Sequence, residues 1–311
     1  MSHRLPAQPI RSAIGTFVGA SGVELFHRSW HCDTVAQRAT VVLAHGVGEH
    51  SGRYEHVGRS LAASGYPVWA LDHRGHGRSG GHRVWVDAFE TYEADLEAFR
   101  ALVARADGVE AAGLVLLGHS MGGAIAVGHV IDHPGAFAAL VLTGPALQPA
   151  RGVSRLTVRA GTIVARLWSK APAIAIDARR VSRDPAVVAA YGVDPLVHHG
   201  KVTAGLGQQL LRRTARFEDE LPGVQIPVLL IHGTDDALVP IAGSRALVGR
   251  FGSPDVTFVE EPGLFHEVLN EPEGERVLAT IVAWLDDHFA GYTGAPASGS
   301  LGAGGPKDAH P

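Results

Sequence analysis

Short apolar runs recur along the chain and alternate with segments in which apolar residues have helical spacing. The apolar runs, each bounded by turn residues, cover residues 41–44, 68–71, 114–117, 140–143, 228–231 and 256–259. Helical patterns cover residues 54–63, 87–106, 121–132, 242–250 and 275–289. Buried strands that alternate with helices predict an α/β fold, with a mostly parallel sheet covered by helices on both faces. Two strand-like pieces at 14–19 and 23–30, split by Ala-Ser-Gly, predict an antiparallel hairpin at the start.

The alternation stops between residues 146 and 221, where helical patterns occur without a convincing strand. We therefore expect a helical cap at 146–221, inserted between two parts of one core at 14–145 and 222–290. Residues 291–311 are rich in Gly, Ala, Ser and Pro, a composition that predicts a disordered tail.

Composition excludes several classes of protein. Hydrophobic residues make up 46% of the chain and charged residues 19%, as in globular proteins with a substantial core. A net charge of −4 gives no basic surface for nucleic acid, so we expect no nucleic-acid partner. One cysteine allows no internal disulfide, and the first residues contain no apolar leader, so a cytoplasmic location is expected. Residues 111–131 carry no charge, but their five glycines indicate a strand, a turn and a helix rather than a membrane span.

The pattern Gly-x-Ser-x-Gly occurs twice and marks a candidate nucleophile. In many hydrolases this pattern forms a sharp turn between a strand and a helix, and the turn exposes the serine hydroxyl. Ser79 follows a charged segment and precedes no clear helix. Ser120 follows the apolar run 114–117 and opens a helix of small residues, so Ser120 is the predicted nucleophile.

A serine nucleophile needs a base and a carboxylate that orients the base. Asp235 and Asp236 follow the apolar run 228–231, and His266 follows the run 256–259 and a Pro-Gly turn. Sites in open α/β sheets collect at these carboxyl ends of strands. We predict His266 as the base and favour Asp236 as the acid, with Asp235 as a loop cap or a solvated side chain.

An oxyanion hole needs two backbone N–H donors. One donor normally belongs to the residue after the nucleophile, here Met121, and the other to a loop after an early strand. The run 41–44 is followed by His-Gly-Val-Gly, which makes Val47 the second predicted donor.

Six motifs together resemble a known family. They are HGVGEHSGRY at 45–54, DHRGHGRS at 72–79, GHSMGG at 118–123, SRDP at 182–185, DPL at 194–196 and HGTDD at 232–236. Over residues 14–289 the chain resembles the monoacylglycerol lipases of the α/β-hydrolase superfamily, most closely those of mycobacteria and related actinobacteria.

The resemblance implies hydrolysis of monoacylglycerols to glycerol and fatty acid through an acyl-enzyme, with no metal and no organic cofactor. It places the catalytic triad on the same serine, aspartate and histidine, and it places glycerol contacts on Glu49 and Arg53. Some members carry a histidine three residues after the catalytic one, where this chain has Leu269.

The resemblance also implies that the insertion is a cap over an apolar acyl tunnel. Read as a helix, residues 156–171 carry an apolar face and an arginine-rich face. Such a helix can contact a lipid surface from the periphery, or it can pack its apolar side over the core.

Other functions fit the motifs less well. Residues 75–80 match Gly-x-Gly-x-x-Gly, but no helical pattern that could bind a dinucleotide phosphate begins before residue 87. A metal hydrolase could use His73 and His76 or the pair at 198–199, but no zinc signature accompanies them. A lysophospholipase, a broad carboxylesterase and a noncatalytic protein of the same fold remain alternatives.

Overall fold

A computed structural model describes residues 9–148 and 167–292, and every structural statement below concerns these residues. The predicted tail and most of the predicted amphipathic helix at 156–171 lie outside them.

One eight-stranded sheet forms the centre of the molecule, with the strand order β1-β2-β4-β3-β5-β6-β9-β10. The strands are β1 (Ile10–Val18), β2 (Glu24–Cys32), β3 (Thr40–Ala44), β4 (Val68–Leu71), β5 (Leu114–His119), β6 (Ala139–Thr143), β9 (Val228–Gly233) and β10 (Val256–Glu261). β2 pairs antiparallel with β1 and with β4, and every other pair in the sheet is parallel.

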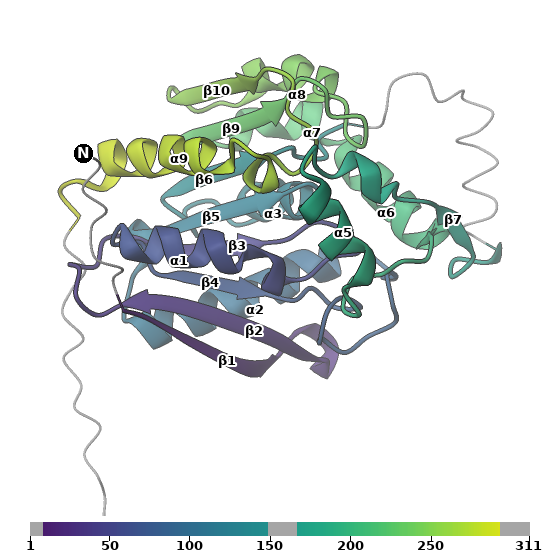
Figure 1. Ribbon diagram of the computed structural model, residues 1–311, viewed down its shortest axis with the longest axis horizontal. Coiled ribbons are helices and arrows are strands. Elements are labelled where there is room, and N and C mark those ends of the chain that lie inside the picture. The colour runs from purple at the N-terminus through teal and green to yellow at the C-terminus, as the bar shows by residue number, and fades with distance from the viewer. Residues whose placement is uncertain (1–8, 149–166, 293–311) are drawn as a thin grey trace, which may run out of the picture.

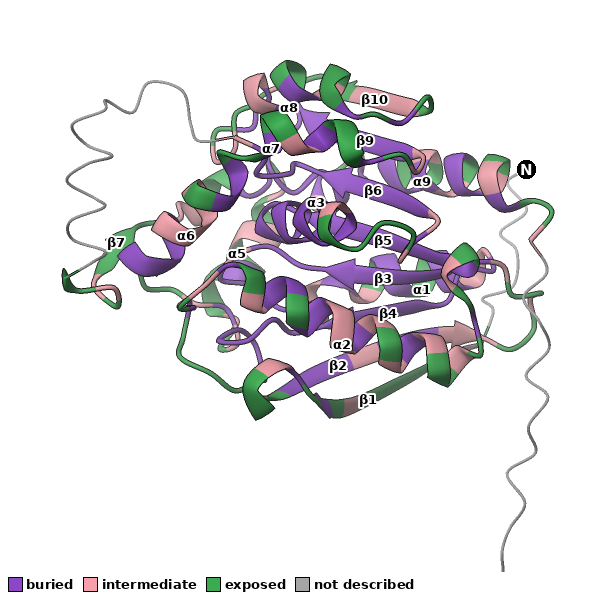
Figure 2. Ribbon diagram, turned by 180° about the vertical axis from the view of Figure 1, so that it is seen from behind, coloured by how far each residue is buried: buried purple, intermediate pink, exposed green. Residues whose placement is uncertain are grey.

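Helices cover both faces of this sheet (Figures 1 and 2). The helices are α1 (Glu55–Ala63), α2 (Glu90–Asp107), α3 (Met121–Asp132), α5 (Pro185–Val193), α6 (Ala204–Thr214), α7 (Phe217–Glu220), α8 (Ala242–Leu247) and α9 (Gly274–Phe289). α1 and α9 lie on the face turned to the viewer in Figure 1, and α2 and α3 lie on the opposite face, which Figure 2 shows.

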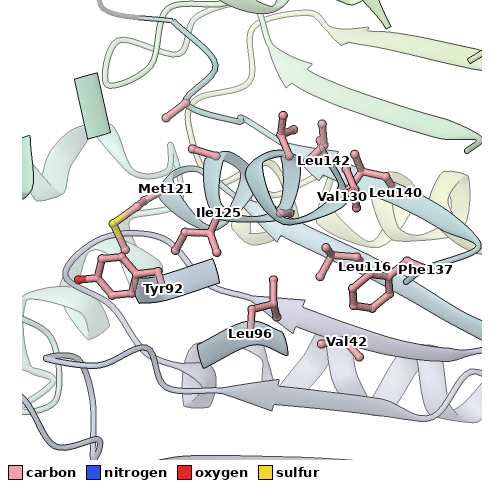
Figure 3. Packing of buried hydrophobic residues seen from close by; sticks show 14 of the residues in the cluster. Val42, Tyr92, Leu96, Leu116, Met121, Ile125, Val130, Phe137, Leu140 and Leu142 are labelled. Carbon is pink, nitrogen blue, oxygen red and sulfur yellow. The ribbon is translucent and has the colours of Figure 1, made fainter. Parts of the chain in front are cut away.

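Alternation along β5 explains why its sequence is one continuous apolar run. Leu114 and Leu116 belong to the hydrophobic cluster under α2 and α3, whereas Val115 and Leu117 belong to the cluster under α1 and α9. Successive side chains of a strand point to opposite faces, so a strand covered on both sides must be apolar throughout. Figure 3 shows Leu116 within the first of these clusters.

The predicted α/β architecture and its strands, opening hairpin and principal helices are confirmed, with boundaries that differ by a few residues. Residues 111–131 form mainly β5 and α3, as predicted from their glycines. In the part of the chain that the structure describes, no helix is long and apolar enough to cross a bilayer.

The expectation that the insertion contains no strand is wrong. β7 (Pro172–Ile174) and β8 (Val202–Thr203) form a second, antiparallel sheet of two strands beside α6. All three residues of β7 are exposed, so its sequence lacks the apolar run that marks a buried strand. In Figure 1, α5, α6 and β7 stand beyond one end of the sheet strands. The division into a core and a cap stays a prediction.

Candidate active site

Ser120 lies in the sharp turn that joins β5 to α3. Its backbone has φ 54° and ψ −118°, a strained conformation for a residue with a side chain. The Ser120 N–H donates to Thr143 O at 3.1 Å, and the Ser120 carbonyl accepts from Ala146 N at 3.0 Å. A Cβ built on Gly122 would overlap the carbonyl groups of Ala44 and His45, so the glycine lets α3 pack against the end of β3. The turn therefore has the geometry of a nucleophile elbow.

Ser79, in the other Gly-x-Ser-x-Gly match, is fixed by the backbone. Its hydroxyl donates to Asp72 O at 2.5 Å and accepts from Phe26 N at 2.8 Å. No helix follows this loop before α2, which also removes the support for a dinucleotide phosphate site at 75–80.

Asp236, not Asp235, contacts His266. The His266 Nδ1 donates to Asp236 Oδ2 at 2.7 Å, which leaves Nε2 free to accept a proton. The Asp235 carboxylate instead accepts from the neighbouring Thr234 hydroxyl at 3.0 Å. Ser120 and His266 line the same cavity, so the structure brings the three predicted residues together at the carboxyl ends of β5, β9 and β10.

His232 was not predicted, and it fixes the Asp236 carboxylate from the other side. Its Nε2 lies 2.8 Å from Val239 O and 3.1 Å from Asp236 Oδ2. A carbonyl oxygen only accepts, so Nε2 carries the proton and Nδ1 accepts from Ser244 Oγ at 2.8 Å. The position of His232 at the end of a buried strand was the one sequence signal for this role.

The electrostatics of the pair favour a charged imidazolium. Burial lowers the pKa of His266, but the charge and hydrogen bond of Asp236, joined by the charges of Glu267 and Glu49, raise that pKa above its ordinary value. Burial also opposes ionisation of Asp236, yet the charge of His266 and hydrogen bonds from His232, His266 and the Val239 N–H hold its pKa well below the ordinary range. Asp236 thus stays ionised and can stabilise His266 when the histidine takes up a proton.

A second buried histidine contacts the base without competing for its proton. The rings of His119 and His266 have centroids 4.7 Å apart. Burial, followed by repulsion from His266, lowers the pKa of His119 to about 4, so His119 is neutral at pH 7. Its Nδ1 lies 2.9 Å from Thr143 O and therefore donates to that carbonyl.

The two predicted oxyanion donors border the cavity beside Ser120. Met121 is the first residue of α3, so its N–H has no acceptor within the helix. Figure 3 shows the Met121 side chain directed at the ring of Tyr92, which anchors this end of α3. Val47 follows Gly46, whose N–H donates to Glu49 Oε1 at 2.6 Å. A Cβ on Gly46 would approach the Ser120 Cβ to 3.1 Å, so this loop lies directly against the elbow.

Glu49 and Arg53 meet in one buried ion network with Glu267, a residue that was not predicted. The Arg53 Nη1 lies 2.8 Å from Glu49 Oε2 and 2.6 Å from Glu267 Oε1, and Nη2 lies 2.7 Å from Glu267 Oε2. The Tyr191 ring covers the guanidinium at 4.7 Å. Glu49, Glu267 and Tyr191 line the cavity, whereas Arg53 is not among its described lining residues.

The cavity has a volume of about 210 Å³ and joins this polar wall to an apolar one. Its apolar lining comes mainly from the insertion and from the loop after β9: Ile174, Ile176, Val181, Val202, Leu206, Leu210 and Leu238. A hydrocarbon chain and a small polar group can therefore occupy one continuous space that Ser120 also lines.

The insertion is bonded to the His266 loop at several points. Val181 O accepts from Glu267 N at 2.8 Å, and Ser182 Oγ donates to Asn270 O at 2.9 Å. The fully buried Glu271 carboxylate accepts from Phe265 N at 3.0 Å, from Arg183 N at 3.1 Å and from Arg183 Nε at 2.7 Å. We call this set of contacts the loop clamp.

The histidines considered as metal ligands make other contacts. His73 and His76 pack with His45 and Tyr92 as a cluster of buried rings. Within residues 9–148 and 167–292, no three His, Cys, Asp or Glu side chains are arranged to hold a metal ion.

Known proteins resemble this chain over most of its length. Residues 35–273 match the family described as serine aminopeptidase S33. The monoacylglycerol lipase of Mycolicibacterium smegmatis is 43% identical, over 88% of this chain and 97% of its own. The human monoglyceride lipase is 34% identical, over 88% and 90% respectively. The crystal structure of Paleococcus ferrophilus monoacylglycerol lipase is 30% identical with a TM-score of 0.75, and it covers 85% of this chain and 99% of its own.

Proposed function

This chain belongs to the S33 family of α/β-hydrolases, among relatives named monoacylglycerol lipases, and we propose that it hydrolyses monoacylglycerols to glycerol and a fatty acid. The observation that carries the proposal is the cavity, because the elbow serine, apolar side chains and buried polar side chains all line it. An acyl chain fits the first wall, and the hydroxyl groups of glycerol fit the second.

The reaction follows from the geometry of the triad. His266 Nε2 accepts the hydroxyl proton of Ser120 as Oγ attacks the ester carbonyl, and Asp236 stabilises the imidazolium. The Val47 and Met121 N–H groups donate to the oxyanion, an effect worth roughly 3–4 kcal/mol for each donor. His266 gives its proton to the glycerol oxygen, which leaves with it. Water then attacks the acyl-enzyme by the same route and releases the fatty acid.

Glu49 is proposed to contact glycerol directly, and Arg53 to hold Glu49 in place. Glu49 borders the cavity, and although burial opposes its ionisation, attraction from Arg53, His119 and His45 and the hydrogen bond from the Gly46 N–H together lower its pKa to about 2. A carboxylate accepts hydrogen bonds and does not donate them, so it suits the hydroxyl donors of glycerol. No feature of the cavity favours a lysophospholipase over this function.

The insertion is proposed to act as the cap and to meet lipid from the periphery. Large apolar side chains are exposed on it at Leu167, Trp168, Ile174 and Val193. Exposed apolar groups of this size bind readily at the boundary of a lipid layer. Reduced binding to oleate-containing vesicles by Trp168→Ser, with unchanged turnover of a water-soluble ester, would support this role.

The function is tested by measuring fatty-acid release from monooleoylglycerol, dioleoylglycerol and lyso-phosphatidylcholine in parallel, with Ser120→Ala as the control. We expect strong turnover of the monoglyceride alone, and none in the variant. Preference for either of the other lipids would show that the proposed substrate is wrong, although the proposed serine-hydrolase mechanism would still hold. Undiminished activity of Ser120→Ala would refute the mechanism.

A further inference from the structure

The polar wall of the cavity holds two carboxylates and one cation. Glu49 and Glu267 are both buried, with side chains 4% and 6% exposed, and Arg53 bridges them. Every contact of the guanidinium with these carboxylates is 2.8 Å or shorter. Among residues 9–148 and 167–292, no second cation contacts either carboxylate, so the wall retains the charge of one of them.

The neighbouring titratable groups do not restore neutrality. His119 is neutral at pH 7 because burial and repulsion from His266 lower its pKa to about 4. Tyr191 stays protonated because burial raises its pKa far above 10. His266 is paired with Asp236 at 2.7 Å, and the charges of Glu267 and Glu49 also raise its pKa, so the base feels the same excess charge. The excess negative charge is thus a property of the cavity wall at neutral pH.

The wall also presents its negative groups, not its positive one, to a ligand. Both glutamates line the cavity, whereas Arg53 is not among its lining residues and packs its guanidinium against the Tyr191 ring. A hydroxyl group entering this space meets hydrogen-bond acceptors. A phosphate group meets like charge from buried carboxylates, whose electrostatic interactions are weakly screened.

Glu267 is the carboxylate that produces the excess. Glu49 has a structural task, because its Oε1 accepts from Gly46 N at 2.6 Å and from the Tyr54 hydroxyl at 2.8 Å. Glu267 adds a second charge directly after the base. The backbone of Glu267 is held by the insertion, because its N–H donates to Val181 O. The Glu267 carboxylate is held by Asn270, whose Nδ2 donates to Oε2 at 2.8 Å.

We propose that Glu267 is a specificity-determining residue that excludes acylglycerols with an anionic head group. The enzyme then accepts esters of uncharged polyols and rejects esters of the same length that carry a phosphate. This inference rests on the proposed function, since it concerns the alcohol side of the same ester bond.

The test compares two substrates that differ only in the phosphate, 1-octanoylglycerol and 1-octanoyl lysophosphatidate, whose short chains keep them dissolved as monomers. We expect kcat/KM for the uncharged ester to exceed that for the anionic one by about 100-fold, the scale of a like-charge contact. In Glu267→Gln this ratio should fall about tenfold or more, because one charge is removed at nearly constant shape. The matched control is Glu260→Gln, which should keep the wild-type ratio. Glu260 is an exposed glutamate on β10 whose carboxylate pairs with Arg245.

Similar kcat/KM values for the two esters in the wild-type enzyme would overturn the inference without any variant. An unchanged ratio in Glu267→Gln would overturn the assignment to this residue, and Glu267→Met provides a second uncharged side chain if the glutamine variant does not fold. Failure of the proposed function would give a different result from failure of this inference. The enzyme would then cleave the simple ester 4-nitrophenyl butyrate but not 1-octanoylglycerol.

Discussion

The loop clamp makes a prediction about a residue that touches no substrate. Glu271 is fully buried and accepts three hydrogen bonds, one from the backbone of Phe265, next to the base, and two from Arg183 of the insertion. Glu271→Ala would leave two backbone N–H groups and one guanidinium N–H without their partner. We therefore expect the variant to lose both stability and activity.

The magnitude follows from the burial of each group. A buried donor that loses its partner costs roughly 1–3 kcal/mol. Arg183 retains Glu273 and has a side chain 34% exposed, so water replaces part of its loss. The two backbone donors together contribute roughly 2–6 kcal/mol of unfolding free energy, which for a chain of this length corresponds to a fall in Tm of roughly 3–9 °C. A shift of the His266 loop by about 1 Å would reduce kcat about 100-fold.

Two measurements separate a positioning role from general destabilisation. Thermal unfolding gives the loss of stability, and the rate at which a fluorophosphonate labels Ser120 well below Tm gives the competence of the Ser120–His266 pair. Glu271→Gln keeps an acceptor oxygen for the backbone donors, so it should recover most of the labelling rate. Glu260→Ala, which removes an exposed ion pair with Arg245, should change neither quantity. A Glu271→Ala enzyme that unfolds earlier but is labelled at the wild-type rate would refute the positioning argument.

Three further predictions concern the elbow and the base. Activity should rise with pH through the raised pKa of His266, because only the neutral imidazole accepts the serine proton. Asp236→Asn should reduce kcat about 10⁴-fold, and it should move the pH midpoint of the residual activity downward. Ser120→Ala should abolish fatty-acid release and leave Tm within a few degrees of the wild type, because the change removes one oxygen atom; a much lower Tm would contradict it. Gly122→Ala should give little soluble enzyme, because its Cβ overlaps backbone carbonyls such as that of Ala44, and normal expression would show that α3 can move away.

The fold could be predicted because its signals are local and repeated. Each central strand is buried on both faces, and this requires an apolar run such as 114–117 that stands out against its turns. The placement of Asp236 and His266 followed from the rule that parallel strands end at one edge of the sheet. Strand order could not decide between Asp235 and Asp236, because both aspartates follow the same strand. The loop geometry decides it, since only Asp236 contacts His266.

The residues that sequence reasoning missed are those whose roles depend on distant partners. β7 is short and exposed, and its two-residue partner β8 lies almost thirty residues away, so neither strand leaves a periodic pattern. Apart from its position at the end of a buried strand, nothing in the sequence indicates that His232 shares the Asp236 carboxylate with His266. Such roles become visible only when the partner is known.

Glu267 shows why a buried charge has to be interpreted from its neighbours. A glutamate beside the catalytic histidine could be exposed, could pair with one cation, or could share a cation with another carboxylate. In the sequence, Arg53 lies more than two hundred positions away, and Glu49 lies four positions before Arg53. Both glutamates contact the same guanidinium, and a buried cation shared by two carboxylates balances only one of them. The polar wall keeps that unbalanced charge in the cavity that Ser120 and His266 also line, because the fold brings Glu267 to Arg53 through the same loop that carries His266.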